Sequence, residues 1–170
     1  MSYYKDAQMA IPQGEMPVME LHNSSPLQAA SLNNNQPVWQ SVFVNLCQQA
    51  DNGQSTSVFV LYGSNQKLVT SMDQLFLLST GQLIRASKLV PGTHELMDKD
   101  GNPVAIMQVS MGTFGEPLYR LAANPPYAGN PDGHLLLANG VIAGDFILNM
   151  NAEELTAKGF VADPQAASRV

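Results

Sequence analysis

Five polar side chains in two stretches of the chain are the first candidates for chemistry. "VTSMDQ" places the hydroxyls of Thr70 and Ser71 beside the carboxylate of Asp73, and "GHLLLANGVIAGDF" contains His134 and Asp145. Hydroxyls, carboxylates and imidazoles act as nucleophiles and as general acids or bases. Asp73 could orient His134 toward a cleft, where the imidazole would transfer protons. The alternative is a partly buried strand histidine that hydrogen-bonds a loop, with Asp73 as a turn residue.

Metal and cofactor sites have little support in the sequence. The three histidines, His22, His94 and His134, have neither helical nor strand spacing for a shared metal ion. The stretch "DKDGNP" (98–103) resembles a calcium loop, but its glycine comes too early and position twelve is Val109, so a hairpin turn is predicted. The chain has no G-x-S-x-G, G-x-G-x-x-G or Walker motif, and we expect no cofactor.

The single cysteine, Cys47, limits the covalent chemistry further. One cysteine excludes an internal disulfide and a cysteine-based zinc cage. Its apolar neighbours in "VFVNLCQQ" favour a small buried strand residue over a reactive thiol.

The charge pattern argues against nucleic acid as a partner. Eight basic residues occur singly in a chain of net charge −6, whereas a phosphate-binding surface needs clustered Lys and Arg. The longest apolar runs are too short to span a bilayer, and the first residues lack the features of a signal peptide. We therefore expect no membrane insertion and no cleaved leader, which leaves the cytoplasm or release without a cleaved leader as compartments.

Short strands must position these groups. About ten runs rich in β-branched and aromatic residues, such as "VWQSVFVNL" and "STSVFVLYG", are separated by Asn-Gly, Pro-Gly and single-glycine turns. This pattern predicts one all-β domain, barrel-like or sandwich-like. Only "RASKL" and "NAEELTAKG" suggest helical turns. In the second, Asn151 and Glu154 have the spacing of a capping box and Gly159 is a natural stop, while "SLNNNQP" (31–37) is predicted as a polar loop.

Alternation along these strands predicts the core. Phe76 and Leu78 alternate with the predicted set and are expected to cover a second face. The residues predicted to form most of the core are Trp39, Phe43, Phe59, Leu61, Leu75, Leu77, Leu83, Leu89, Ile106, Val109, Leu118, Leu121, Leu135, Leu137, Val141 and Ile142.

Four segments in order resemble the Hint (hedgehog/intein) family. "AIPQGEMPVMEL" (10–21) is similar to the Hint opening, which runs nucleophile, apolar residue, Pro, x, Gly and a strand. "VTSMDQLFL" resembles the T-x-x-H block with its strand, and "GQLIRASKLVPGTHELMDKDGNPVAIMQV" resembles the hairpin, A-x-x-L corner and strand pair that follow. "DGHLLLANGVIAGDF" resembles the closing block, in which an Asn-Gly turn precedes a His-Asn end. The resemblance implies a horseshoe-like or barrel-like Hint fold with a short C-terminal helix beyond it, and two chain ends that meet at one cleft.

In the family, a Cys or Ser attacks the preceding carbonyl, the block histidine protonates the leaving amine, and a terminal Asn cyclises. When the positions of the family are carried over to this chain, the nucleophile position falls on Ala10. The block histidine falls on Gln74, whose amide does not ionise near neutral pH. The hydroxyl falls on Ser71, with Thr70 one step earlier. The terminal His-Asn pair falls on Gly144 and Asp145, followed by Phe146. The resemblance therefore implies a scaffold that lacks the self-cleavage and splicing groups.

Three interpretations follow. The first is a degenerate Hint domain, residues 10–146 between flanking segments 1–9 and 147–170, that acts as a structural or protein-interaction module. Its partner would be another protein or flanking segments of its own precursor. The second is an autoprocessing Hint domain whose nucleophile is replaced at Ala10, cutting by an N–S or N–O acyl shift. The third is an unrelated all-β capsid, tail or adhesion component, because the surface is weakly charged and rich in Asn and Gln.

Overall fold

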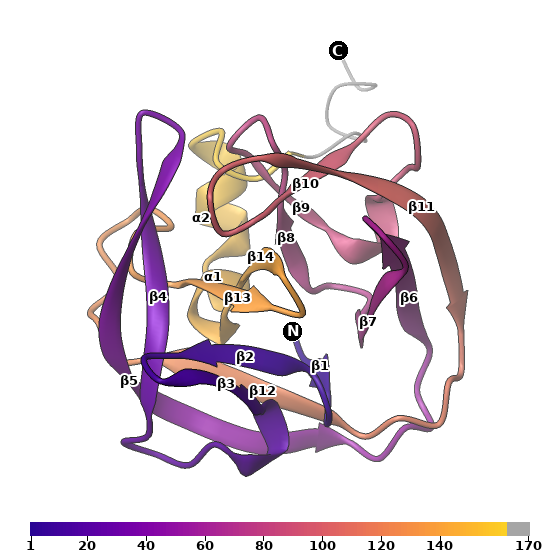
Figure 1. Ribbon diagram of the computed structural model, residues 1–170, viewed down its shortest axis with the longest axis horizontal. Helices are drawn as coiled ribbons and strands as arrows, with labels where there is room; N and C mark the ends of the chain where they lie inside the picture. The colour runs from indigo at the N-terminus through magenta and orange to yellow at the C-terminus, as the bar shows by residue number, and fades with distance from the viewer. Residues whose placement is uncertain (163–170) are drawn as a thin grey trace.

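Strands dominate the computed structural model, which describes residues 1–162 (Figure 1). The strands are β1 (Tyr3–Tyr4), β2 (Gln8–Ile11), β3 (Gly14–Pro17), β4 (Pro26–Asn33), β5 (Gln36–Asp51), β6 (Ser57–Tyr62), β7 (Gln66–Ser71), β8 (Leu75–Leu77), β9 (Leu83–Arg85), β10 (Glu95–Met97), β11 (Pro103–Gly112), β12 (Leu118–Ala123), β13 (Leu135–Ala138) and β14 (Val141–Gly144). The helices are two 3-10 turns, Val18–Glu20 and Ala86–Lys88, and the short α1 (Phe146–Met150) and α2 (Ala152–Ala157). The helical turn predicted at "RASKL" is thus confirmed.

The strands form one continuous curled sheet. Its order is β10-β11-β6-β7-β1-β12-β5-β4-β13-β14-β8-β9, and the β2–β3 hairpin joins it through β13. Figure 1 shows the strands curling around the centre of the view, with the N-terminus on the inside near β1. The predicted all-β architecture with a short C-terminal helix is confirmed. Within residues 1–162, no helix combines the length and the apolar character that crossing a membrane requires.

The β4–β5 hairpin is larger than the sequence predicted. β4 pairs with β5 from Pro26 opposite Phe43 to Asn33 opposite Gln36. The stretch predicted as a polar loop is therefore mostly strand, and its turn uses Asn34 and Asn35. Both have positive φ, 51° and 60°, which Asn tolerates better than other residues with a side chain.

The core lies on both faces of the curled sheet. β8 and the residue after it show this best, because Phe76 and Leu78 pack into one cluster while Leu75 and Leu77 pack into the other. The predicted second face is thus confirmed, and most of the predicted core residues are buried. These are Leu75, Leu77, Leu83, Leu89, Ile106, Leu118, Leu121, Leu135, Leu137, Val141 and Ile142.

Five core predictions are wrong or only partly correct, because alternation does not reveal which face of a strand is covered. In β5, Phe43 is 53% exposed, while its neighbours Val42 and Val44 are buried. In β6, Phe59 and Leu61 are only half-buried. The buried side chains of that strand are the alternate set, Val58, Val60 and Tyr62. Trp39 and Val109 are also half-buried.

The C-terminal helices pack as part of this core. Leu148 of α1 and Leu155 of α2 are fully buried, and Gly159 ends the segment with a φ of +86°. The predicted capping box at Asn151 is wrong. Its side chain donates backward to the Ile147 carbonyl at 2.8 Å and does not cap α2.

Candidate functional site

The N-terminal strand β1 and the end of β14 meet beside β7. β1 lies between β7 and β12, with Tyr3 opposite Thr70. The Tyr3 hydroxyl donates to the Gly144 carbonyl at the end of β14, at 2.7 Å. A residue near the start of the chain therefore contacts the predicted terminal junction directly.

Gln74 holds this meeting point together. Its Nε2 donates to the Gly144 carbonyl at 2.8 Å and to the Leu75 carbonyl at 3.0 Å, and lies 3.3 Å from the Tyr3 hydroxyl. The side chain is fully buried, and within residues 1–162 its Oε1 has no hydrogen-bond partner. Gln74 is thus an amide that links the N-terminal strand to the end of β14 but cannot ionise.

The upstream junction, defined here as the Met1–Ser2 peptide with Ser71 and Asp73, is held by a short chain of hydrogen bonds. The Ser2 amide donates to Ser71 Oγ at 2.9 Å, and the Ser71 amide donates back to the Ser2 carbonyl at 3.0 Å. Ser71 Oγ in turn donates to Asp73 Oδ1 at 2.7 Å, and the Met1 amino group lies 2.8 Å from the same oxygen. The hydroxyl that contacts the upstream peptide is therefore that of Ser71.

Asp73 is charged in this arrangement. Burial would raise the pKa of Asp73, but hydrogen bonds from the Met1 amino group and the Ser71 hydroxyl outweigh it and lower the pKa. Its side chain remains 51% exposed, and its other oxygen accepts from Asn149 of α1 at 3.2 Å. Asp73 thus ties the upstream junction to the helix that follows the downstream one.

The downstream junction, defined here as Gly144–Asp145–Phe146 with His134, is closed to water. His134 Nδ1 lies 2.7 Å from Asp145 Oδ2, and both side chains are 0% exposed. Asp145 Oδ2 also accepts the Ala123 amide at 2.9 Å, and Oδ1 accepts the Leu148 amide at 3.1 Å. Asp145 is therefore the N-cap of α1. The partner of His134 is Asp145, so the prediction that Asp73 orients it is wrong.

Burial and pairing shift the titration of this junction. Burial raises the pKa of Asp145, although the His134 imidazole and two backbone amides oppose that shift. Burial alone would lower the pKa of His134, but the hydrogen bond and charge of Asp145 outweigh it, so this pKa is raised. Burial and the nearby Asp145 charge also raise the pKa of Tyr3. The phenol is therefore a neutral hydrogen-bond donor at physiological pH.

Gly144 leaves little space for a side chain. A Cβ placed there would lie 3.2 Å from Leu148 Cδ1 and 3.4 Å from Leu75 Cβ. The absence of a side chain at Gly144 therefore lets α1 approach β14 and β8 closely.

The other predicted site residues lie apart from this chemistry. Ala10 sits in β2 opposite Glu15 and packs against the second core cluster. Thr70 is buried, and its hydroxyl donates to the Ser71 carbonyl at 3.0 Å. Sequence reasoning missed Ser2 and Tyr3, because a two-residue strand carries no alternation to detect. In Cys47, burial raises the thiol pKa to about 11, so the residue stays an unreactive thiol at neutral pH.

Similar solved structures are inteins and an intein-like domain. The bacterial intein-like domain from Clostridium thermocellum shares 14% identity with a TM-score of 0.71, covering 85% of this chain and 98% of that one. The DnaB intein from Synechocystis sp. PCC 6803 shares 13% identity with a TM-score of 0.67, covering 85% and 97%. The gp41-1 intein shares 17% identity with a TM-score of 0.64, covering 85% and 98%.

No protein-family model and no curated protein matches the sequence. At these identities the likeness concerns the fold, and it overturns the interpretation of an all-β module unrelated to the Hint architecture. Almost the whole of each intein is covered, whereas about a seventh of this chain lies outside the likeness. The chain therefore has the intein-like Hint fold.

Proposed function

We propose that this Hint-fold domain does not cut its own backbone and acts as a structural or protein-interaction module. The observation that supports this most is the packing of the segment after Asp145 into the core. Leu148 and Leu155 are 0% exposed, and Val161 is 2% exposed and bridges to Leu83. Each such side chain contributes about 1.5–3 kcal/mol on burial. A segment that a self-cutting domain would release is instead bound to it.

The downstream junction lacks a free attacking group. Cyclisation would require a side-chain atom of Asp145 to reach the carbonyl of its own residue. Both carboxylate oxygens are occupied, Oδ1 by the Leu148 amide and Oδ2 by the Ala123 amide and His134. Attack would break the cap of α1 and leave buried groups without partners, at a cost of about 1–3 kcal/mol each.

The upstream junction lacks an acid for the leaving amine. We infer that Ser2, rather than Ala10, occupies the nucleophile position, because its amide bonds to Ser71. A serine hydroxyl can form an ester, but its activation needs a neighbouring base and the departing amine needs a proton. Gln74 supplies neither, and its amide hydrogens are already directed at Gly144, Leu75 and Tyr3.

The test is the mass of the intact chain carried between an upstream and a downstream affinity tag. After several days at neutral pH, with thiol or hydroxylamine added to trap esters, we expect one uncut species; the untagged chain has a mass of 18.3 kDa. Fragments that end at Met1 or Asp145 would contradict the proposal. A Gln74→His, Asp145→Asn double variant restores the imidazole and the amide. Cleavage in that variant alone would show that the missing groups, and not the scaffold, stop the reaction.

The second candidate function is autoprocessing at Ser2, and the hydrogen bond between the Ser2 amide and Ser71 Oγ favours it. Under this alternative an N–O acyl shift moves the upstream segment from the Ser2 amide nitrogen to Ser2 Oγ as an ester, and water or added hydroxylamine then cleaves that ester and releases the upstream tag. Ser2→Ala prevents the loss. Ala10→Cys would change nothing, because Ala10 lies opposite Glu15 in the β2–β3 hairpin. Thiol-dependent cleavage of the Ala10→Cys variant at residue 10 would instead restore Ala10 as the nucleophile position.

A further inference from the structure

Three adjoining cavities form one elongated groove along β7. The first, of about 220 Å³, is lined by Tyr4, Phe59, Lys67, Val69, Phe114 and Glu116. The second, of about 360 Å³, shares Tyr4 and Lys67 with the first. The third, of about 500 Å³, shares Glu15, Gln66 and Gly140 with the second. The groove therefore follows the chain from Val69 back to the turn at Gly63 and Ser64.

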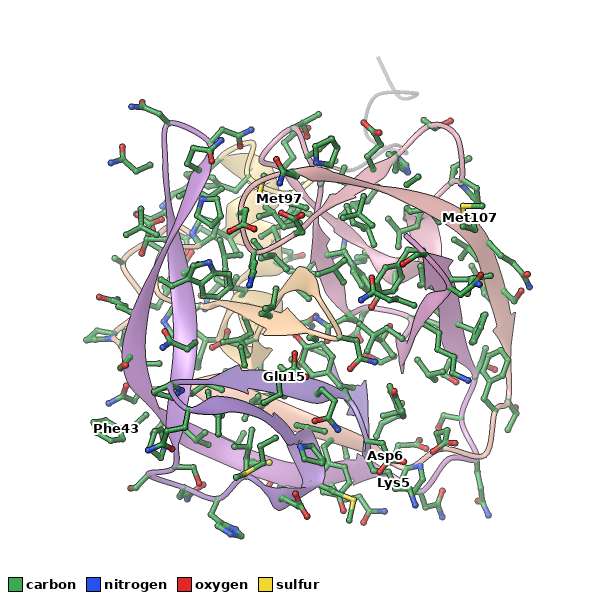
Figure 2. The ribbon with its side chains drawn as sticks, viewed as in Figure 1. Lys5, Asp6, Glu15, Phe43, Met97 and Met107 are labelled. Atoms are coloured by element: carbon green, nitrogen blue, oxygen red, sulfur yellow. The ribbon has the colours of Figure 1, made fainter. Side chains whose placement is uncertain are left out.

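The two ends of this groove differ in chemistry. At one end, Phe59 and Phe114 have ring centroids 6.0 Å apart, and Phe114 is 38% exposed. At the other end the lining includes the carboxylates of Glu15, Asp98 and Asp100, against the single ammonium group of Lys99. Figure 2 labels Glu15 near the middle of the view, on the β2–β3 hairpin that borders the groove.

The carboxylates at the acidic end outnumber the one ammonium group that lines the same cavity. Asp98 shapes its own turn by accepting the Asp100 and Asn102 amides at 2.9 Å. Glu15 and Asp100 are exposed, and neither forms an ion pair within residues 1–162. In a chain of net charge −6, this end attracts cationic groups.

We propose that the groove binds an extended peptide that carries an aromatic or large aliphatic side chain at one end and Lys or Arg at the other. The apolar side chain enters the cavity of Tyr4, Phe59 and Phe114, and the basic residues face Glu15 and Asp100. The path from Val69 to Gln66 is about 10 Å at strand spacing, and the turn beyond lengthens it, so roughly four to six residues fit. The proposal rests on the proposed function, because it names the partner of a non-cutting interaction module.

Recognition is by side chains and not by strand addition. Among the described residues 1–162, β1 pairs with β7 only at Thr70, which leaves the edge from Gln66 to Val69 without a strand partner there. The Lys67 carbonyl on that stretch already accepts from Asn139 Nδ2 at 2.8 Å. An added strand would have to displace that bond, whereas side chains can enter the cavities with the bond in place.

The test uses six fluorescein-labelled peptides that contain one Phe and two Arg. A spacer of two, three or four residues, made of Gly and Ser, separates the Phe from the Arg pair. For each spacer length, one peptide carries the Phe before the Arg pair and the other carries it after. We expect at least one peptide to bind the full chain with a Kd below about 1 mM, as fluorescence anisotropy would show. The affinity should fall at least about fivefold when the salt is raised from 50 to 500 mM or the Arg pair is replaced by Ser. If none of the six peptides saturates, the proposal is wrong.

Variants locate the binding. Phe114→Ala and the double change Glu15→Gln, Asp100→Asn should each weaken the best peptide at least about fivefold, and the double change should leave an Arg-free peptide unaffected. Matched controls outside the groove are Phe43→Ala, at the left margin of Figure 2, and Glu153→Gln on α2. Equal losses in groove and control variants would overturn the assignment. The intact mass of the same samples separates the two proposals. If the chain is uncut and binds no peptide, only the groove proposal is contradicted. If fragments appear, the proposal that the domain does not cut itself is contradicted.

Discussion

The two junctions meet at Gln74 but differ in how they are closed. The upstream junction depends on Ser71 and on Asp73, whose side chain is 51% exposed. The downstream junction is formed by His134 and Asp145, both 0% exposed, and by the helix that Asp145 caps. Polar groups at the upstream junction can exchange a protein partner for water. Polar groups at the downstream junction are buried and have no alternative partner when one is removed. The downstream junction should therefore contribute far more to stability.

The largest expected effect is that of Asp145→Ala. Removing the carboxylate leaves the Ala123 and Leu148 amides and His134 without their buried acceptor. We expect a loss of about 3–5 kcal/mol in the free energy of unfolding, measured by urea denaturation. Asp145→Asn keeps one oxygen and should lose clearly less. The upstream counterpart, Asp73→Ala, should lose under about 1 kcal/mol because water replaces the carboxylate. Equal losses at the two junctions would refute the comparison.

Leu155→Ala tests whether the segment after the downstream junction belongs to the core. Leu155 is fully buried on α2, so we expect a loss of about 2–5 kcal/mol in thermal or urea unfolding. Met150, at the end of α1, is 66% exposed, and Met150→Ala should change stability by no more than about 0.5 kcal/mol. A Leu155→Ala variant as stable as the Met150→Ala control would mean that the helices are loosely attached.

Gln74→Met tests the link between the junctions. The change keeps the length of the side chain but removes the donor to the Gly144 and Leu75 carbonyls, so we expect a loss of about 1–3 kcal/mol. The Tyr3 hydroxyl still bonds to Gly144, and for this reason the loss should be smaller than that of Asp145→Ala. A more stable variant would show that the unpaired Gln74 Oε1 costs more than its amide hydrogen bonds contribute.

The smallest effects are those of pH, and the two junctions should differ in sign. Because the pKa of His134 is raised, its contribution to stability is complete below about pH 6.5 and is lost as pH rises through the raised value. The pKa of Asp145 is also raised, so its protonated form contributes stability that is lost as pH rises from about 3.8 through its own raised value. The lowered pKa of Asp73 gives stability that is present above 3.8 and lost as pH falls through the lowered value. Urea midpoints from pH 2.5 to 9 measure both. Asp145→Asn should flatten the alkaline slope and Asp73→Asn the acidic one.

The sequence predicted the order of strands and turns better than it predicted contacts between distant residues. Asn-Gly and glycine turns and β-branched runs are local signals, so the curled all-β fold was predictable. The choice between Phe59 and Val58, or between Phe43 and Val42, depends on what covers each face, and strand alternation carries no such information. The carboxylate partner of His134 was missed for a similar reason, because the pairing depends on how β13 and β14 return to β12.

At Asn151 the local signal itself was misread. The spacing to Glu154 matches a capping box and Asn151 directly precedes α2, but the Ile147 carbonyl of α1 lies within reach and the Asn151 side chain bonds there instead. At the N-terminus the local signal is too weak to use. The two-residue strand β1, which brings Ser2 to Ser71, has no pattern of its own, and only its pairing with β7 reveals it.

The close approach at Gly144 sets the distance between the sheet and the helices that follow it. A Cβ there would lie 3.2 Å from Leu148 Cδ1, tighter than most real contacts, so a larger residue requires Leu148 to give way. Because Leu148 is fully buried, that movement would loosen α1 from β14. This one glycine thus acts as the spacer that fixes how tightly the C-terminal segment is held.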